Sequence, residues 1–183
     1  MSQFIRIDEY AADAFQTFDG TEVVITPKLV LFWKPPNPFG QWTASPFEID
    51  GKHYCCAEQY MMAEKARLFG DTKIEEQIMN SDDPRYHQQL GKRVVGFEQG
   101  LWTAERCKIV FRGNFAKFTQ NRNLGDLLIE TENRRLVEAS PIDKIWGIGI
   151  AANDPLAYDQ KNWRGLNLLG GVLEDVRNQI KLG

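Results

Sequence analysis

The pattern of apolar residues changes near residue 57, and this change constrains the fold more than any other feature of the sequence. Before it, short runs rich in Val, Ile and Phe are separated by turn residues, which is typical of strands. These runs cover residues 4–7, 22–25 and 29–33, and a further run at 46–49 ends at the turn Asp50-Gly51. After it, apolar residues recur at helical spacing. The sequence therefore predicts one predominantly α-helical α+β domain with a few short N-terminal strands.

The helical part contains three clear periodic segments. Residues 102–118 form an expected core-facing stripe made of Cys107, Val110, Phe111, Phe115 and Phe118. A short helix is expected to begin at Leu124. The last helix is predicted from Leu169, Val172, Leu173, Val176 and Ile180, with Asn167 as its N-cap.

Composition excludes several classes of protein. A net charge of −3 over 183 residues, with scattered Lys and Arg, argues against avid, non-specific binding to nucleic acid. Residues 1–10 lack the apolar segment of a secretory signal, and no apolar run is long enough to cross a bilayer. Three cysteines without a CxxC spacing indicate reduced thiols. We therefore expect a soluble cytoplasmic protein with no membrane partner.

No metal site is expected. The two histidines lie outside any HxxxH or HExxH setting. A zinc site would have to be assembled from His53, Cys55 and Cys107, which are distant or unsuited in spacing. These residues are interpreted as core or surface positions, and no redox cofactor is expected either.

Glu58 and Lys65 form the most informative pair of charged residues. If both lie on one helix, a spacing of seven residues places them on nearly the same face, roughly 10 Å apart along the axis. Direct ion pairs on a helix join residues three or four positions apart. Glu58 and Lys65 are therefore either part of a solvated polar face or are directed toward a ligand that lies between them.

Two glycine-containing segments have the composition of ligand-binding loops. Residues 146–152 superficially match the GxGxxA dinucleotide fingerprint, but Pro155 follows where that motif needs a helix. The segment is thus either a loop that approaches a ligand, with Trp146 available for stacking, or a tight turn with a core tryptophan. Residues 162–171 lead into the last helix with Gly170 and Gly171 in its first turn, which is suited either to phosphate binding or to close packing.

In order and spacing, a series of short motifs resembles the NADAR family (NAD- and ADP-ribose-associated, also called YbiA-like). The resemblance covers roughly residues 30–181 and rests on the set as a whole. The matching segments are residues 45–47, 50–51, 58–65, 90–94, 102, 117–118, 136–140, 143, 146–149, 163–170 and 177. One departure is Gly40-Gln41-Trp42, where the family commonly has a Ser-Asn pair before its aromatic residue.

The resemblance implies a fold, an activity and a domain division. It implies an N-glycosidase that cleaves a ribose C1–N bond, with a domain at residues 29–183 and an extension at residues 1–28. The implied substrates are ADP-ribose attached to guanine in nucleic acid or, alternatively, phosphoribosylamino-pyrimidine intermediates of riboflavin synthesis. It implies no metal or redox cofactor.

The residues and the resemblance together assign roles to individual side chains. Glu58 is expected to stabilise positive charge at C1 or to activate water, and Lys65 to contact phosphate or, if neutral, to form a Schiff base. Asp154 is expected to act in acid–base catalysis, with Asp143 as a second candidate. Residues expected to bind substrate are Trp42, Trp146, Gly147, Gly149, Trp163, Arg164, Asn167 and Gly170.

Two readings of another kind stay open at this point. The same residues would serve a sensor that binds ADP-ribose without cleaving it, and the N-terminal strands would serve an accessory protein that binds a partner. The basic and aromatic stretch at 112–122 would suit a DNA strand, although its spacing equally fits a buried helix face.

Overall fold

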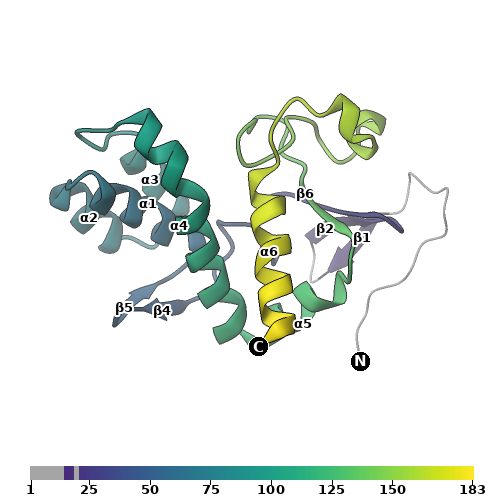
Figure 1. Ribbon diagram of the computed structural model, residues 1–183, viewed down its shortest axis with the longest axis horizontal. Helices are drawn as coiled ribbons and strands as arrows, with labels where there is room; N and C mark the ends of the chain where they lie inside the picture. The colour runs from purple at the N-terminus through teal and green to yellow at the C-terminus, as the bar shows by residue number, and fades with distance from the viewer. Residues whose placement is uncertain (1–14, 19–20) are drawn as a thin grey trace. The chain divides into compact units, whose positions relative to one another are not determined.

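The computed structural model describes residues 15–18 and 21–183 (Figure 1). Its strands are β1 Phe15–Phe18, β2 Thr21–Ile25, β3 Leu29–Phe32, β4 Phe47–Ile49, β5 Lys52–Tyr54 and β6 Arg135–Glu138. Its helices are α1 Ala57–Leu68, α2 Thr72–Met79, α3 Pro84–Gly91, α4 Gln99–Gln120, α5 Arg122–Glu130 and α6 Leu168–Leu182, with short 3₁₀ helices η1 Pro155–Tyr158 and η2 Gln160–Asn162. The predicted α+β class with a helical majority is confirmed.

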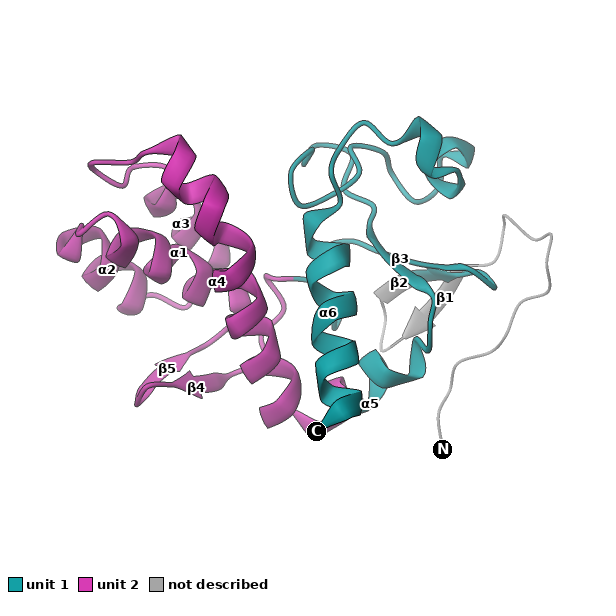
Figure 2. Ribbon diagram, in the orientation of Figure 1, with its two compact units in different colours: residues 1–40, 126–183 teal, residues 41–125 magenta. Residues whose placement is uncertain are grey.

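The chain forms two compact units (Figure 2). Unit 1 contains the described residues up to 40 together with 126–183, and unit 2 contains residues 41–125. Each unit is considered below by itself.

Unit 1 is built on a sheet of four strands in the order β1-β2-β3-β6. The first three pair antiparallel, while β6 pairs parallel to β3, with Leu31 opposite Val137. Helix α6 packs against β6 (Figure 1). The core on this sheet contains Val24, Leu31, Val137, Ala139, Ile148, Ile150 and Ala157.

Unit 2 combines a hairpin with four helices. Strands β4 and β5 pair antiparallel across Asp50-Gly51, and both turn residues have positive φ, 53° and 71°. This is the backbone that a two-residue type I′ turn requires. Helix α1 packs against α2, α3 and α4 and buries most of its side chains, so it is the central helix of the unit.

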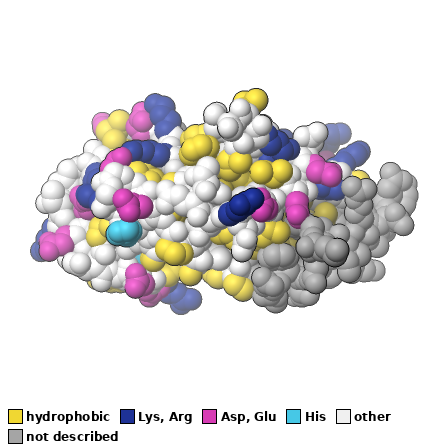
Figure 3. All heavy atoms as spheres, turned by 90° about the horizontal axis from the view of Figure 1, so that it is seen from below, with side chains coloured by type: hydrophobic (Ala, Val, Ile, Leu, Met, Phe, Trp, Pro, Cys, Tyr) yellow, Lys and Arg dark blue, Asp and Glu magenta, His cyan; other side chains and the backbone are white. Residues whose placement is uncertain are grey.

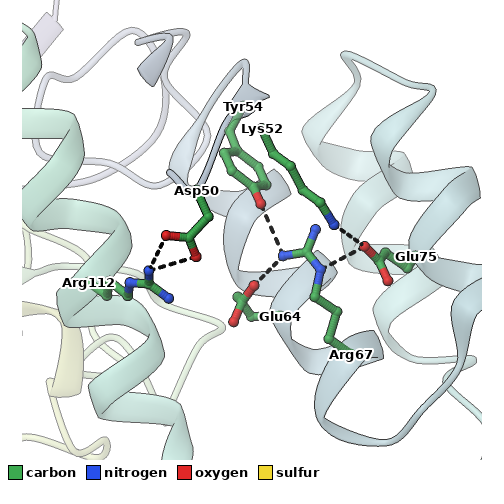
Figure 4. A network of polar contacts seen from close by, with 7 residues as sticks. All are labelled: Asp50, Lys52, Tyr54, Glu64, Arg67, Glu75 and Arg112. Atoms are coloured by element: carbon green, nitrogen blue, oxygen red, sulfur yellow. Dashed lines mark hydrogen bonds and ion pairs between the residues drawn. The ribbon is translucent and has the colours of Figure 1, made fainter. Parts of the chain in front are cut away.

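A polar network holds the second half of α1 in place (Figure 4). The Arg67 guanidinium donates to Glu64, to Glu75 at 2.6 Å and to the Tyr54 hydroxyl at 3.0 Å. Lys52 joins the same Glu75 carboxylate at 3.0 Å. Burial alone would lower the pKa of Arg67, but these acceptors raise it overall. The network therefore fastens α1 to β5 and α2.

Most predicted elements lie where the sequence indicated. The strands expected at 22–25 and 29–33 are β2 and β3, and the helix beginning near Leu124 is α5. The strand expected at 4–7 lies outside the described residues. Strand β6 was not anticipated, and the division of the chain at residue 28 stays a prediction. Across the described residues, no helix combines the length and apolar character needed to cross a bilayer.

Two local expectations differ from the structure. On α4 the residues Cys107, Phe111 and Phe115 are half-buried, and the buried face runs instead through Arg106, Val110, Asn114 and Lys117. Phe111 and Phe115 stack on each other with ring centroids 6.0 Å apart. Asn167 does precede α6, but its side chain makes no cap hydrogen bond and its φ is 52°.

Candidate functional site

Glu58 lies in the first turn of α1 and is buried, with 3% of its surface exposed. Its backbone N–H donates to the Gln41 carbonyl at 3.0 Å, which ties the start of the helix to the preceding loop. A carboxylate in the first turn is favoured by the helix dipole. Because buried carboxylates are rare unless their surroundings compensate them, Glu58 is not part of a solvated charged face.

Lys65 lies two turns further along α1 and is partly buried. Its Nζ donates to the Gly91 carbonyl at 2.7 Å and lies 4.3 Å from the Phe97 ring centroid and 5.4 Å from that of Trp102. Burial lowers the pKa of Lys65, and the negative charge of Glu58 partly opposes this shift. The two side chains singled out from the sequence thus interact electrostatically along one helix.

The loop before β4 contributes the residues at which the sequence departs from its family. Gln41 is buried, and its amide Oε1 has no hydrogen-bond partner among the described residues. Trp42 beside it is half-buried. Because Gln41 also accepts from Glu58 through its backbone, the loop that carries Trp42 is joined directly to the start of α1.

Lys117 is a second unusual lysine of unit 2, and it is fully buried on α4. Burial lowers the pKa of Lys117 to about 7, opposed in part by Cys56. Sequence reasoning noted this residue only as part of a family motif. Lys117 comes seven residues after Val110 and directly before Phe118, so it lies on the same face of the helix as these two apolar residues. This spacing was the signal that a charged residue is buried in the core.

In unit 1, the glycine-containing loop after β6 is anchored by its apolar residues. Ile148 and Ile150 are core residues, while Trp146 is half-buried. A Cβ added at Gly147 would lie 2.8 Å from the Glu138 carbonyl oxygen, and Gly149 has φ +68°. Both glycines are thus required by the path of the backbone, and their contact with a ligand stays a prediction.

Two carboxyl groups lie at the base of this loop. Asp143 Oδ1 accepts from the backbone N–H groups of Ile145 and Trp146, at 2.7 and 2.9 Å, and so shapes the turn. Glu138 ends β6, and its buried Oε2 has no hydrogen-bond partner among the described residues. Burial, with a smaller contribution from Asp143, raises the pKa of Glu138 to about 8. Glu138 therefore holds a proton at neutral pH, a property that sequence reasoning missed.

Trp163 and Arg164 follow η2 and differ in exposure. Trp163 packs against the unit 1 core, and its indole N–H donates to the Ala157 carbonyl at 2.8 Å. The Arg135 guanidinium lies 5.5 Å from its ring centroid. Arg164 is exposed, while its backbone N–H donates to the Ile148 carbonyl at 2.9 Å. Of the two, Arg164 has the side chain available to a ligand.

Asn167 and Gly170 join the start of α6 to β6. The Asn167 side chain accepts a hydrogen bond from Glu138 N–H at 2.9 Å and donates one to the Leu136 carbonyl at 2.8 Å. It therefore pairs with β6 in the way that the backbone of a neighbouring strand does. A Cβ at Gly170 would overlap the Leu136 carbonyl oxygen, whereas one at Gly171 would meet nothing within 4 Å among the described residues. Close packing accounts for Gly170, and a phosphate-binding role stays a prediction.

Asp154 caps the short helix η1. Its Oδ1 accepts from Leu156 N–H at 2.9 Å, directly before Pro155. Pro155 is tolerated there because the first helical residue needs no N–H donor. The role of Asp154 in catalysis stays a prediction, and the observed hydrogen bond gives this residue a structural function as well.

The histidines and cysteines are arranged differently from the set considered in the sequence. His53 is exposed and lies 3.6 Å from Glu48. His87 instead is buried on α3, close to Cys55 and Cys56. The stretch at 112–122 also has a structural use, because the Arg112 guanidinium donates to both carboxylate oxygens of Asp50 at 2.8 Å (Figure 4).

The arrangement of charged residues on α1 is suited to one kind of chemistry. A buried carboxylate and a lysine of lowered pKa on one helix, within an α+β fold, are suited to stabilising or trapping a cationic sugar carbon. The sequence matches the NADAR domain family over residues 31–181. The chain belongs to the NADAR family.

Individual relatives support this placement. N-glycosidase R617 of Acanthamoeba polyphaga mimivirus is 42% identical over 146 residues, which cover 77% of this chain and 86% of that protein. N-glycosidase YbiA of Escherichia coli (strain K12) is 26% identical over 162 residues, 87% of this chain and 92% of that protein. The NMR structure of E. coli YbiA superposes with a TM-score of 0.71, at 26% identity, over 87% of this chain and 88% of that one. The chain is an enzyme of the N-glycosidase class.

Proposed function

We propose that this enzyme hydrolyses the C1–N bond between a ribose and a base, and that its substrate is ADP-ribose attached to guanine in nucleic acid. The observation that carries the proposal is the buried Glu58 on α1, coupled electrostatically to Lys65. The names of the relatives, N-glycosidase R617 and N-glycosidase YbiA, support the bond type. The substrate is inferred from the family resemblance.

Glu58 is proposed to act at the sugar carbon. Cleavage of a glycosidic C–N bond builds positive charge at C1 as the electron pair leaves with the base. A carboxylate stabilises that charge most strongly where water is excluded, because the local dielectric constant is low. The burial of Glu58 meets this condition. Replacing its charge by an amide should therefore affect kcat more than KM.

Lys65 is proposed as a nucleophile or as a cationic contact. Its lowered pKa increases the neutral fraction that a nucleophilic amine requires. Attack of that amine on C1 would displace the base with its electron pair. Opening of the sugar ring would then give an imine, and water would hydrolyse the imine to release the ribose product and regenerate the amine. The exposed Phe97 ring beside the Lys65 ammonium offers a flat apolar surface on which a base can stack.

For unit 1, taken by itself, we propose one acid–base residue and several binding residues. Asp154 is the proposed acid–base residue, and Glu138, whose pKa burial raises to about 8, is a further candidate for donating a proton. Arg164 is the proposed contact to phosphate, and Trp146 the proposed stacking partner. The remaining proposed binding residues are Trp42 through its loop and, through their backbone, Gly147, Gly149, Trp163, Asn167 and Gly170. A cytoplasmic location belongs to this proposal and is supported by three free thiols.

The proposal is tested by turnover on two substrates. A DNA oligonucleotide carrying one ADP-ribosylated guanine and a phosphoribosylamino-uracil are incubated in parallel with the wild type, Glu58→Gln and Lys65→Ala. Loss of the ADP-ribose mass from the oligonucleotide is expected for the wild type. For each variant we expect a loss of roughly 10²-fold or more in kcat, with an unchanged circular dichroism spectrum. Glu76→Gln, at an exposed position on α2 of the same unit, is the matched control and should retain turnover.

Other outcomes decide between the alternatives. Turnover of the small molecule alone would assign the enzyme to riboflavin intermediates. Tight binding of ADP-ribose with no turnover of either substrate would defeat the enzymatic proposal in favour of a sensor. Full activity of both variants would remove Glu58 and Lys65 from the mechanism. Borohydride added during turnover should trap an adduct at Lys65, and an adduct elsewhere, or none, would leave Lys65 as an electrostatic contact.

A further inference from the structure

Two cysteines and a histidine of unit 2 place their ligand atoms together at the start of α1. One ligand atom each from Cys55, Cys56 and His87 lies within 4.8 Å of the others. The sulfurs of Cys55 and Cys56 are 3.7 Å apart. Two thiolates on a tetrahedral zinc ion, each at about 2.3 Å, are separated by about 3.8 Å. The two sulfurs are thus already spaced as a zinc-bound pair would be.

One nitrogen of the His87 ring is held by a backbone carbonyl, and the other is not. His87 is fully buried, and its Nε2 lies 2.7 Å from the Ser81 carbonyl, to which it donates. In that tautomer Nδ1 is buried and carries a lone pair, and the His87 ring also interacts with the Cys56 side chain. A histidine that binds a metal through one nitrogen almost always donates its other N–H to a carbonyl or carboxylate. His87 has this arrangement.

A third side chain supports the cluster. Gln59 donates from Nε2 to the Ser81 carbonyl at 2.9 Å and to the Ile78 carbonyl at 3.1 Å. Its Oε1 accepts from Cys55 N–H at 2.7 Å. The Ser81 carbonyl therefore accepts hydrogen bonds from both His87 and Gln59. Gln59 in turn accepts a hydrogen bond from the backbone N–H of Cys55. This framework orients Cys55 and His87, and Cys56 follows Cys55 directly in the chain.

The chemistry of the donors selects the ion. Thiolate and imidazole ligands favour zinc over magnesium or calcium, which prefer oxygen. Cys56 is buried, while Cys55 is half-buried and its Sγ lies 3.9 Å from the Asp82 carbonyl oxygen. We propose that Cys55, Cys56 and His87 bind one Zn²⁺, with a water molecule at the fourth position. Such an ion would clamp the start of α1, two residues before Glu58, to the connection between α2 and α3.

Cobalt substitution tests the site directly. The full-length protein is reduced, treated with a chelator and titrated with Co²⁺ while the absorption spectrum is recorded. One equivalent should give a thiolate-to-cobalt charge-transfer band and the visible bands of a tetrahedral ion, and Zn²⁺ should abolish both. Cys55→Ser and His87→Gln should lose these bands. Cys107→Ser and His53→Gln are matched controls and should keep them.

Clear outcomes would overturn the proposal. The first is that the wild-type protein shows no cobalt bands, and the second is that the bands persist in Cys55→Ser. The third is that Cys55 and Cys56 form a disulfide and the reduced protein binds no Co²⁺. Circular dichroism checks folding. If His87→Gln unfolds, the half-buried Cys55→Ser decides alone. Zn²⁺ should also raise the melting temperature of the wild type and leave that of Cys55→Ser unchanged. The result is independent of turnover, so it leaves the proposed glycosidase function untouched.

Discussion

Glu138 shows how strongly position changes the chemistry of a single residue. In the sequence it is one glutamate in a short apolar run. In the structure it ends a strand, and its Oε2 has no hydrogen-bond partner in the part of the chain that the structure describes. Its pKa of about 8 follows mainly from burial. Ionisation of such a group in the folded state costs free energy, and this cost can be measured.

The first prediction concerns stability and pH at this residue. The unfolded chain ionises Glu138 from its ordinary pKa of 4.5, whereas the folded protein keeps the proton up to about 8. As the pH rises between these values the unfolded state therefore binds fewer protons, and the free energy of unfolding falls, by at most about 1.4 kcal/mol per pH unit. Glu138→Gln should lack this contribution, so its stability relative to the wild type should increase steadily from about pH 5 to about pH 8.

Urea denaturation at several pH values measures this difference. Asp175→Asn, an exposed position on α6 of the same unit, is the control and should show no such trend. A difference between Glu138→Gln and the wild type that is constant across the range would contradict the raised pKa.

Sequence reasoning singled out some candidate side chains and missed others for physical reasons. Glu58 and Lys65 were identified because their seven-residue spacing is a local property of one helix. His87 could not be paired with Cys55 and Cys56, because that proximity depends on how α3 packs against α1. The lowered pKa of Lys117 was also missed: the helical spacing hinted at a buried position, but the burial itself comes from other elements.

At the scale of elements, short-range patterns were more informative than burial. The turn at Asp50-Gly51 and the periodic last helix were predicted correctly, because turn chemistry and a long apolar stripe are local signals. Strand β6 was missed, because a parallel strand pairs with β3 from about a hundred residues away. The stripe expected on α4 was rotated, because α1 packs against the side of α4 that carries Gly113.

The packing of α4 on α1 yields a prediction at this scale. A Cβ at Gly113 would overlap the Tyr60 ring, with Cε1 at 3.0 Å and Cγ at 3.2 Å. Gly113→Ala improves helix propensity by about 1 kcal/mol, but overpacking a rigid ring costs typically 1–3 kcal/mol. We expect a net loss of stability of about 1 kcal/mol in urea denaturation.

Gly100, in the first turn of the same helix, provides the matched control. A Cβ there would meet nothing within 4 Å among the described residues, so Gly100→Ala should be neutral or slightly stabilising. If Gly113→Ala is as stable as Gly100→Ala, the Tyr60 ring can move to make room for the added methyl group. The close approach of α4 and α1 would then not require glycine at position 113.

At the scale of the whole molecule, charge is the property that bears on the substrate. The net charge is −3. On the face shown in Figure 3, Lys and Arg side chains are interspersed with acidic and uncharged ones. Arg112 is already paired with Asp50. A nucleic-acid substrate would therefore be held mainly through its modified base and the attached ADP-ribose, with few contacts to the phosphate backbone.

This argument predicts a weak dependence on salt. With about two backbone contacts to a single strand, a fourfold increase in salt lowers binding by about sevenfold, whereas six to ten such contacts would lower it by about 300-fold or more. We expect kcat/KM for a modified oligonucleotide to fall by no more than about tenfold under this change. The same measurement on the ADP-ribosylated guanine nucleotide supplies the control for the ADP-ribose phosphates. A fall in kcat/KM of more than about 100-fold on the oligonucleotide alone would show that a row of basic residues contacts the phosphates of the strand. Recognition would then depend on the nucleic acid itself.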